Sequence, residues 1–470
     1  MTTRGCLFLG GRWQAPRDGG TREVENPATE LVIARVAEGG PRDVDAAVHA
    51  ARRAFPSWSG LEVTDRVAVL ERWYDELLAV HDELVATTVA EVGAPVVIAR
   101  EAHVELGLAV LRGYLDASKD VAWEEQVGSS VVLREAAGVA ACITPWNYPF
   151  YQVLAKLGGA LVAGCTVVLK PAELTPLSAY LLAEAADRAG LPAGVLNLVP
   201  GAGSVVGEAM VTHPDVDVVS FTGSTGVGAR ITALAAPTVK RVCLELGGKS
   251  ASVVLDDADL VAAVTGTVQA AMLNSGQTCS AWSRLLVPAS RLAAATELAA
   301  TAAAGLVLGD PLDERTWLGP LVSAAQRATV AGFVDRAVAA GARVVAGGSA
   351  RPAPVGHFHA ATVLAGVAPD AEVVREEVFG PVLTVQGFDT DDEAVALANA
   401  TAYGLHGGVW SADPARALGI ARRLRTGQVD VNGAAFNPSA PFGGYGRSGN
   451  GRELGRHGIE EFLETKSVQR

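Results

Sequence analysis

Lysine is scarce in this sequence, and the chain carries no surplus of positive charge. Arginine and lysine together number 38, against 51 aspartates and glutamates, so that the net charge is −13. This excess of acid argues against nucleic acid or an anionic membrane surface as a partner. Lysine is found only at Lys119, Lys156, Lys170, Lys240, Lys249 and Lys466.

The chain also lacks closely paired cysteines. Its five cysteines are scattered and odd in number, and no CxxC pair is present. This usage predicts free thiols in a reducing compartment, and we therefore expect a cytoplasmic protein. The closest histidine pair, His357 and His359, has no cysteine, aspartate or glutamate cluster beside it, so no metal ion is predicted.

Long apolar runs are missing as well. Segments such as 302–308 are far shorter than the roughly 20 residues that a membrane helix needs. The first residues contain no extended apolar stretch, so no signal peptide is expected. We therefore predict neither a membrane partner nor a secretory route.

What the sequence does contain is a large apolar fraction arranged in alternating elements. The chain has 470 residues, 49% hydrophobic and 19% charged, enough for two or three globular domains. A strand over 166–170, a helix over 177–189 and strands over 195–199 and 216–221 follow one another. This alternation predicts an α/β fold with a parallel, doubly wound sheet.

Periodicity predicts further elements on both sides of this region. The N-terminal part should hold a hairpin over 8–13, a strand over 31–36, helices over 43–55, 66–90 and 102–117, and a strand over 128–135. A helix is expected from Ala229 onward. The C-terminal part should hold helices over 290–304, 324–340, 391–399 and 414–424, strands over 343–346, 382–385, 407–410 and 429–432, and a final edge strand.

Two reactive side chains dominate the middle of the chain. Glu245 ends an apolar run that is typical of a buried strand, and two glycines follow it. Cys279 lies in a segment of small residues whose backbone N–H groups could stabilise a thiolate and later an oxyanion. A thiolate near a carboxylate suits covalent acyl chemistry with a hydrolytic second half. Taken alone, however, Cys279 is more often a small buried hydrophobe, and Glu245 an ordinary strand end.

Several loops near these residues could bind an anion or a nucleotide. Asn147 lies between two prolines and could donate to an oxyanion, or could simply close its own turn. Lys170 and Glu173 follow a strand, where open α/β sheets bind nucleotides. Ser224 precedes a helix and could hold a phosphate or serve only as an N-cap. The glycine string that contains Gly203 is one residue too long for GxGxxG and is weak support for a dinucleotide.

Ordered strings across the chain resemble the aldehyde dehydrogenase superfamily. They extend over nearly the whole sequence, and seven strings in the family's order are a specific signal. The matching strings are Thr-Pro-Trp-Asn147, Lys170-Pro-Ala-Glu173, Phe221-Thr-Gly-Ser224, Glu245-Leu-Gly-Gly, Gly-Gln-Thr-Cys279, Glu377-Val-Phe379-Gly-Pro and Pro441-Phe-Gly-Gly. One departure is Gly446, where many relatives carry lysine.

The resemblance implies a fold and a division into domains. The fold would join a Rossmann-like cofactor domain, a second α/β catalytic domain and a small β oligomerisation element. The cofactor domain would cover 1–118 and 136–246, the catalytic domain 247–447, and the oligomerisation element 119–135 and 448–470. Such enzymes are homodimers or homotetramers.

The resemblance also implies roles for individual residues. Cys279 would be the nucleophile and Glu245 the general base of deacylation, with Asn147 and the Cys279 N–H forming the oxyanion hole. Lys170 and Glu173 would bind the adenosine ribose of NAD, Ser224 its pyrophosphate, and Glu377 and Phe379 the nicotinamide side. The remaining expected cofactor contacts are Thr144, Trp146, Gly203, Gly223, Val227 and Leu246.

The implied reaction is the NAD-dependent oxidation of an aldehyde to a carboxylic acid without transfer to coenzyme A. Cys279 would attack the aldehyde, the alkoxide would lose hydride to NAD+, and water activated by Glu245 would hydrolyse the thioester. Two rivals stay open: an acylating enzyme that uses coenzyme A, and an inactive relative that only binds. The presence of both Glu245 and Cys279 argues against them.

The substrate pocket implied by the resemblance contains no charged side chain. Its expected lining residues are Tyr148, Tyr151, Gln152, Leu273, Phe436 and Phe442. An uncharged, apolar aliphatic or aromatic aldehyde is therefore expected, because a carboxylate buried there would have no partner. A betaine-type aldehyde bound by cation–π contacts is the alternative, and a semialdehyde comes after it. These aromatic residues could also be plain core.

Overall fold

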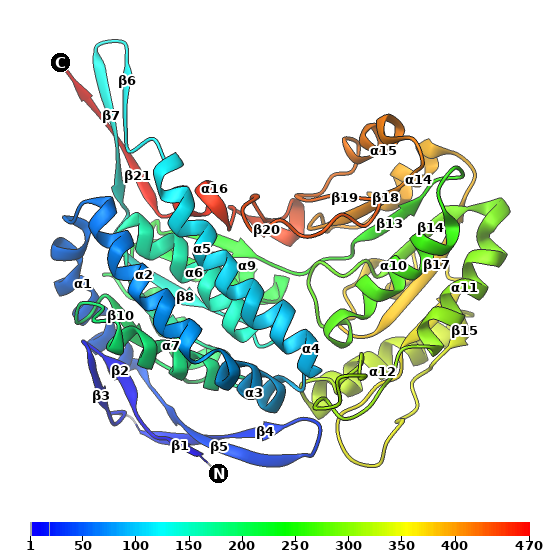
Figure 1. Cartoon of the computed structure of the whole chain (residues 1–470), viewed down its shortest axis with the longest axis horizontal. Helices are drawn as coiled ribbons and strands as arrows, with labels where there is room; N and C mark the ends of the chain where they lie inside the picture. Colours follow the sequence, from blue (N-terminus) through cyan, green and yellow to red (C-terminus); the bar gives the residue numbers. More distant parts are fainter. Residues whose placement is uncertain (1, 18) are drawn as a thin grey trace.

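The computed structural model describes residues 2–17 and 19–470. Met1 and Asp18, which fall within the range expected for the cofactor domain, lie outside the described residues. Figure 1 shows two lobes joined side by side, with a narrow β ribbon projecting from the first lobe near the C-terminus. The first lobe comes mainly from the N-terminal half of the chain, and the second from the C-terminal half.

The first lobe is organised around one large mixed sheet. Its central strands are all parallel, and antiparallel strands close both edges. The register places Thr222 beside Glu245 and Ile143 beside Lys170, so the carboxyl ends of these strands meet at one edge. In spatial order the strands are β20 (Gly449–Asn450), β12 (Arg241–Glu245), β11 (Val218–Thr222), β8 (Val139–Ile143), β9 (Thr166–Lys170), β10 (Leu196–Leu198), β2 (Leu7–Leu9) and β3 (Arg12–Gln14).

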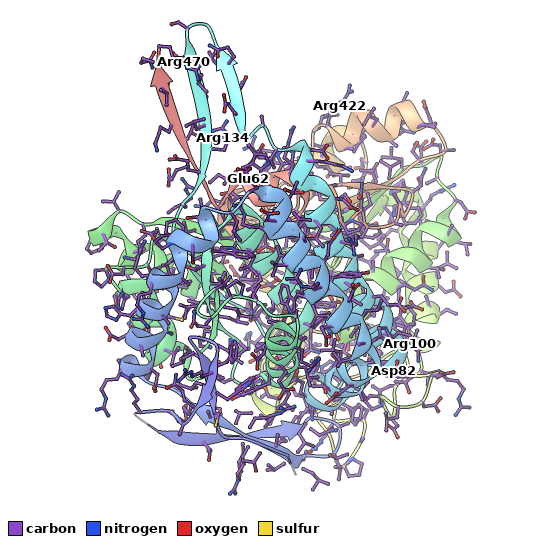
Figure 2. The ribbon with its side chains drawn as sticks, turned by 60° about the vertical axis from the view of Figure 1, so that its left-hand side comes forward. Glu62, Asp82, Arg100, Arg134, Arg422 and Arg470 are labelled. Carbon is purple, nitrogen blue, oxygen red and sulfur yellow. The ribbon has the colours of Figure 1, made fainter. Side chains whose placement is uncertain are left out.

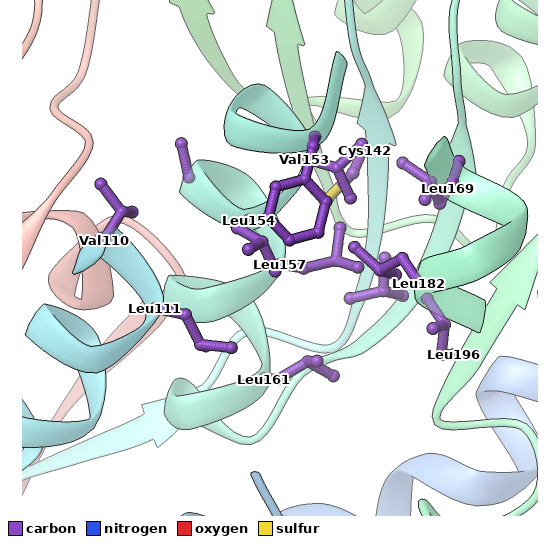
Figure 3. Packing of buried hydrophobic residues seen from close by; sticks show 14 of the residues in the cluster. Val110, Leu111, Cys142, Val153, Leu154, Leu157, Leu161, Leu169, Leu182 and Leu196 are labelled. Carbon is purple, nitrogen blue, oxygen red and sulfur yellow. The ribbon is translucent and has the colours of Figure 1, made fainter. Parts of the chain in front are cut away.

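Helices cover both faces of this sheet, as a doubly wound fold requires. Strands β8 and β9 are buried along their whole length because apolar side chains meet helices on either side. Figure 3 shows Leu154, Leu157 and Leu161 of one helix packed toward Leu169 and Leu196 of the sheet. The helices of this lobe are α1 (Pro41–Ser59), α2 (Val63–Ala79), α3 (His81–Val92), α4 (Val96–Ile98), α5 (Leu106–Ala117), α6 (Pro149–Ala163), α7 (Leu177–Arg188), α8 (Glu208–Thr212), α9 (Thr225–Ala235) and α16 (Gly455–Glu460).

The second lobe repeats the same architecture on a second sheet. All its strand pairs are parallel except β15 with β16. In spatial order the strands are β15 (Arg343–Ala346), β16 (Thr362–Ala365), β17 (Val382–Phe388), β14 (Arg284–Pro288), β13 (Ala251–Val254), β18 (Gly407–Trp410) and β19 (Asp430–Val431). The helices are α10 (Leu260–Met272), α11 (Leu292–Ala304), α12 (Ala324–Ala339), α13 (Glu372–Arg375), α14 (Asp391–Ala398) and α15 (Pro414–Ala421). The expected α/β fold is therefore confirmed.

Two smaller sheets complete the structure. β6 (Glu124–Val127), β7 (Ser130–Ala136) and β21 (Leu463–Gln469) form the projecting ribbon, on which Figure 2 places Arg134 and Arg470. The other sheet contains β1 (Thr2–Arg4), β5 (Leu31–Glu38) and β4 (Gly20–Asn26). Within 448–470, β21 joins the ribbon, whereas β20 pairs with β12 and α16 packs on α5 and α6.

Short 3₁₀ and π segments connect these elements. The 3₁₀ segments are η2 (Ser118–Asp120), η4 (Ala236–Thr238), η5 (Leu273–Gly276), η6 (Ala289–Arg291) and η7 (Gly446–Ser448). The π segments are η1 (Ala99–Glu105) and η3 (Gly203–Gly207). None of the helices in the part of the chain that the structure describes combines the length and the apolar character of a membrane span.

Two predicted helices differ from the structure. The helix predicted over 66–90 is two helices that meet at Val80, whose φ of −107° and ψ of 19° leave the helical range. Asp82 and Glu83 follow in the first turn of α3, where carboxylates stabilise a helix N-terminus. The helix predicted over 102–117 begins earlier and opens with the π segment η1.

The helix predicted from Ala229 instead begins at Thr225. Its first turn contains Gly226 and Gly228, which lower helix propensity, and for this reason the predicted helix started after them. A Cβ on Gly228 would lie 2.6 Å from the Leu246 side chain. Glycine is therefore required there for close packing and does not end the helix.

Candidate active site

Cys279 lies on a tight loop between α10 and β14. Asn274, Ser275 and Gly276 all adopt positive φ, between 53° and 71°, which turns the chain sharply before the cysteine. The loop is held from outside: the Ser275 hydroxyl donates to the Gly319 carbonyl at 2.9 Å, and the Gln277 side chain accepts from the Val322 N–H at 2.9 Å. The sharp turn and these bonds fix the position of the thiol.

The thiol is reached from two cavities. One cavity, of about 500 Å³, is mainly apolar, and the other, of about 220 Å³, lies beside Ser224 and Glu377. Burial, reinforced by the Glu245 and Glu377 carboxylates, raises the pKa of Cys279, and the Ser280 N–H opposes this only in part. Burial and the neighbouring carboxylates favour the neutral thiol, whereas the Ser280 N–H favours the thiolate, so the role expected of the backbone N–H groups stays a prediction.

Asn147 is tied to the nucleophile loop rather than to its own turn. Its side-chain N–H donates to the Gln277 carbonyl at 2.9 Å, and its own carbonyl accepts from the Asn274 side chain at 2.9 Å. Both amides are buried. This double link joins the loop before α6 to the cysteine loop, and Asn147 and Cys279 line the same cavity.

Glu245 lies at the carboxyl end of β12 and is buried. Within the described residues, neither of its carboxylate oxygens makes a hydrogen bond of normal geometry. Burial, and next the Glu453 carboxylate, raise the pKa of Glu245 well above its usual range, although the Lys156 ammonium opposes them. A carboxyl group in this setting binds a proton more strongly than it does in water, so its ionised form is a stronger base.

Sequence reasoning missed the charged pair that surrounds Glu245. The Lys156 ammonium on α6 donates to the Glu453 carboxylate at 2.7 Å and to the Ser220 hydroxyl at 3.2 Å, and both charged groups are buried. Lys156, Ser220 and Glu453 come from segments that are distant in sequence. The only sequence signal was a lysine in an otherwise apolar helix, which by itself does not reveal its partner.

The second cavity brings together most of the residues expected to contact the cofactor. Its lining includes Trp146, Asn147, Gly223, Ser224, Leu246, Glu377 and Phe379. Glu377 accepts from the Gly248 N–H at 2.9 Å, and burial raises the pKa of Glu377 to about 7. Phe379 has a φ of +56°, and its ring meets that of Trp146 edge-on at 5.2 Å.

Ser224 occupies the N-cap of α9 without making a capping hydrogen bond through its side chain. The interpretation of Ser224 as only an N-cap is therefore not supported by the side-chain hydrogen bond that defines such a cap. Ser224 lines the cavity beside the first turn of an eleven-residue helix, where anions are favoured.

Lys170 and Glu173 lie together beyond the end of β9. Their charged groups are 3.6 Å apart, and the Glu173 carboxylate accepts from the Gly203 N–H at 2.6 Å, so Gly203 belongs to this group. Burial would raise the pKa of Glu173, but the Lys170 ammonium and the Gly203 N–H outweigh it and lower the pKa. Thr144 and Val227 are absent from the lining described for the second cavity: Thr144 is buried beside Lys170, and Val227 is exposed on α9.

The apolar cavity contains all six expected pocket residues: Tyr148, Tyr151, Gln152, Leu273, Phe436 and Phe442. Ala102 and Leu106, in and just after η1, also line it. The expectation of a lining without any acidic residue is wrong, because Asp430 forms part of the wall together with His406. His406 directly precedes β18, and Asp430 begins β19. No local sequence pattern predicted that either residue would line the cavity.

Comparison with known proteins assigns this fold and site to a family. The family model described as "Aldehyde dehydrogenase family" matches residues 13–468. A 3-succinoylsemialdehyde-pyridine dehydrogenase from Pseudomonas sp is 46% identical over 465 residues, which are 98% of both chains. The structure of a mutant aldehyde dehydrogenase C from Pseudomonas syringae with NAD+ and octanal has a TM-score of 0.98 and 46% identity, covering 99% of this chain and 96% of that one. An aldehyde dehydrogenase from Mycobacterium tuberculosis with NAD+ has a TM-score of 0.97 and 39% identity, covering 100% and 98%.

The chain therefore belongs to the aldehyde dehydrogenase family, as its sequence motifs indicated. It is an oxidoreductase that uses NAD to oxidise an aldehyde.

Proposed function

We propose that the enzyme oxidises an uncharged, largely apolar aldehyde to the free acid, with Cys279 as nucleophile. The observation that carries this proposal is that Cys279 lies on the wall shared by two cavities. One is apolar enough for an aldehyde tail, and the other contains the polar groups that suit a dinucleotide. The carbonyl carbon and the cofactor can thus reach the thiol from opposite sides.

The residues of the second cavity fit NAD+. The uncapped Ser224 hydroxyl and the first turn of α9 suit a pyrophosphate. Outside the lining of this cavity, the ionised Glu173 beside Lys170 at the end of β9 suits a ribose. Glu377 and Phe379 would orient the nicotinamide end next to Cys279. NAD+, when bound, supplies the acceptor for the hydride that the substrate loses.

The chain's own groups would handle charge and protons during the reaction. The Asn147 amide and the Cys279 N–H would donate to the oxygen that becomes negative when the thiol adds to the aldehyde. The thiol would release its proton to solvent water for this addition, against a pKa that burial and the neighbouring carboxylates raise. After oxidation, Glu245 would take a proton from the water that attacks the thioester.

We predict a preference for NAD over NADP. Glu173 stays ionised, accepts from Gly203 and would repel a 2′-phosphate at the ribose. The ratio of kcat/KM for the two cofactors should therefore favour NAD, and Glu173→Gln should shift this ratio toward NADP by roughly tenfold. Glu208→Gln, which neutralises an exposed carboxylate paired with Arg230, serves as the control. A wild-type enzyme with higher kcat/KM for NADP would contradict the prediction.

We also predict that kcat/KM is highest for an uncharged aldehyde. The panel is hexanal, benzaldehyde, succinic semialdehyde and betaine aldehyde, with NADH formation measured with and without coenzyme A. The two relatives named for octanal and for a pyridine semialdehyde support a bulky, uncharged tail. The highest value for succinic semialdehyde would refute the proposal, and the highest for betaine aldehyde would favour the betaine-type alternative. A strict need for coenzyme A would indicate the acylating reaction.

We further propose that the protein is a cytoplasmic homodimer or homotetramer that assembles through the projecting ribbon. Support comes from its shape: β6 and most of β21 expose both faces to solvent, and Val127 and Val468 are exposed there. Light scattering of the purified enzyme tests the assembly.

We propose three domains. The cofactor domain covers 1–118 with 136–246, the catalytic domain 247–447, and the oligomerisation element 119–135 with 448–470.

A further inference from the structure

One acidic side chain interrupts the apolar wall of the substrate cavity. Asp430 begins β19, and His406 directly precedes β18, the strand that pairs with β19. Among the described residues that line this cavity, Asp430 is the single carboxylate, and neither lysine nor arginine is present. A carboxylate in such a place needs an explanation, because charged side chains are otherwise rare in apolar cavities.

The carboxylate is held in place from two sides. Its Oδ1 accepts from the Gln428 side chain at 3.1 Å, and its Oδ2 lies 3.0 Å from His406 Nε2. This second contact does not have the geometry of a hydrogen bond, so His406 Nε2 makes none among the described residues. The side chain of Asp430 is 14% exposed and that of His406 is 9% exposed, so both positions are largely shielded from bulk water.

The hydrogen bonds of His406 indicate the charge of the pair. The Trp282 indole N–H donates to His406 Nδ1 at 3.3 Å, which requires a lone pair on that nitrogen and therefore a neutral ring. The Ser280 carbonyl lies 3.0 Å from the same nitrogen, and a ring with its one proton on Nδ1 would donate there and would also be neutral. Only protons on both ring nitrogens would make an imidazolium that cancels the Asp430 charge. With the Trp282 bond formed, the pair keeps one net negative charge on the cavity wall.

We propose that Asp430, positioned by His406 and Gln428, is a specificity-determining residue of the substrate cavity. Its negative charge repels aldehydes whose tail carries a carboxylate and attracts aldehydes whose tail is cationic. Uncharged tails are bound by the apolar wall of the cavity. Because the Asp430 side chain is largely shielded from bulk water, this charge is weakly screened, so its effect on a charged tail is large. This inference rests on the proposed function, since it assigns the tail of the aldehyde to this cavity.

The test is Asp430→Asn, which removes the charge and keeps the size of the side chain. We measure kcat/KM for succinic semialdehyde, betaine aldehyde and hexanal, and divide the first two values by the third. The ratio for succinic semialdehyde should rise about tenfold, and the ratio for betaine aldehyde should fall by a similar factor. Opposite shifts for opposite charges distinguish lost charge from damaged folding, which would lower all three values together.

Two further variants make the result decisive. Asp392→Asn removes an equal charge from an exposed site paired with Arg423 and should leave both ratios unchanged. His406→Gln removes the ring and keeps the Asp430 charge, so it should retain the discrimination against succinic semialdehyde. A stronger discrimination in His406→Gln would mean that the wild-type pair is neutral and would overturn the proposal. Unchanged ratios in Asp430→Asn would overturn it as well, whereas a wild-type enzyme inactive on hexanal would instead refute the proposed function.

Discussion

Replacing Cys279 with alanine is expected to abolish dehydrogenase activity, by at least roughly a thousandfold, while leaving the fold and NAD+ binding intact. The thiol is the nucleophilic side chain at the junction of the two cavities, and its removal leaves no group that can form the thiohemiacetal. The loop should keep its shape, because Ser275, Gln277 and Asn147 hold it without using the sulfur. NADH formation with hexanal measures the loss, and fluorescence titration with NAD+ measures binding.

Cys243→Ala is the matched control for this prediction. Cys243 lies two residues before Glu245 on β12, and its thiol contacts the Glu461 carboxylate at 3.3 Å instead of facing either cavity. We expect this variant to keep its activity. An inactive Cys243→Ala beside an active Cys279→Ala would show that the nucleophile has been assigned to the wrong cysteine.

Glu245→Gln is expected to separate the two halves of the reaction. Glutamine keeps the shape of the side chain but cannot accept a proton, so hydrolysis of the thioester should slow by about 100-fold to 10,000-fold. The oxidation that precedes it should be less affected. Stopped-flow measurement should therefore show a rapid burst of NADH followed by very slow turnover.

Glu461→Gln provides the comparison for Glu245→Gln. It neutralises a carboxylate that faces Cys243 and the Arg452 N–H, outside the two cavities, and we expect ordinary turnover. If the burst in Glu245→Gln disappears together with the steady state, Glu245 also removes the proton from the Cys279 thiol. That result is physically reasonable because the Glu245 carboxylate acts directly on the pKa of the thiol.

The sequence allowed the reactive residues to be found because their surroundings are local. Glu245 ends an apolar strand before two glycines, and Cys279 ends a short string of small residues, so each was visible within about ten positions. The strand β13 and the helix α10, which lie between them, were not predicted at all. Their apolar residues run nearly continuously, so neither the period of a strand nor that of a helix was distinct.

The electrostatic surroundings of these residues could not be predicted. Lys156 and Glu453 are almost 300 positions apart and meet at 2.7 Å, which only the packing of α16 against α6 brings about. The pKa of Cys279 depends on burial and on Glu245 and Glu377, three contributions that come from different elements. The amides next to Cys279 were visible in the sequence, whereas the carboxylates that favour the neutral thiol were not.

By itself, the sequence determined the α/β class and the family, and it supplied the residues that we propose carry the reaction. Those properties follow from hydrophobic periodicity and from short ordered strings, which act over a few residues along the chain. Only the tertiary structure decided which cavities meet at Cys279, that Glu245 is buried beside a Lys156–Glu453 pair, and that Asp430 and His406 line the substrate wall. Charge and burial depend on distance through space, and the distances between these residues are set by how helices and strands pack within each lobe and where the two lobes meet.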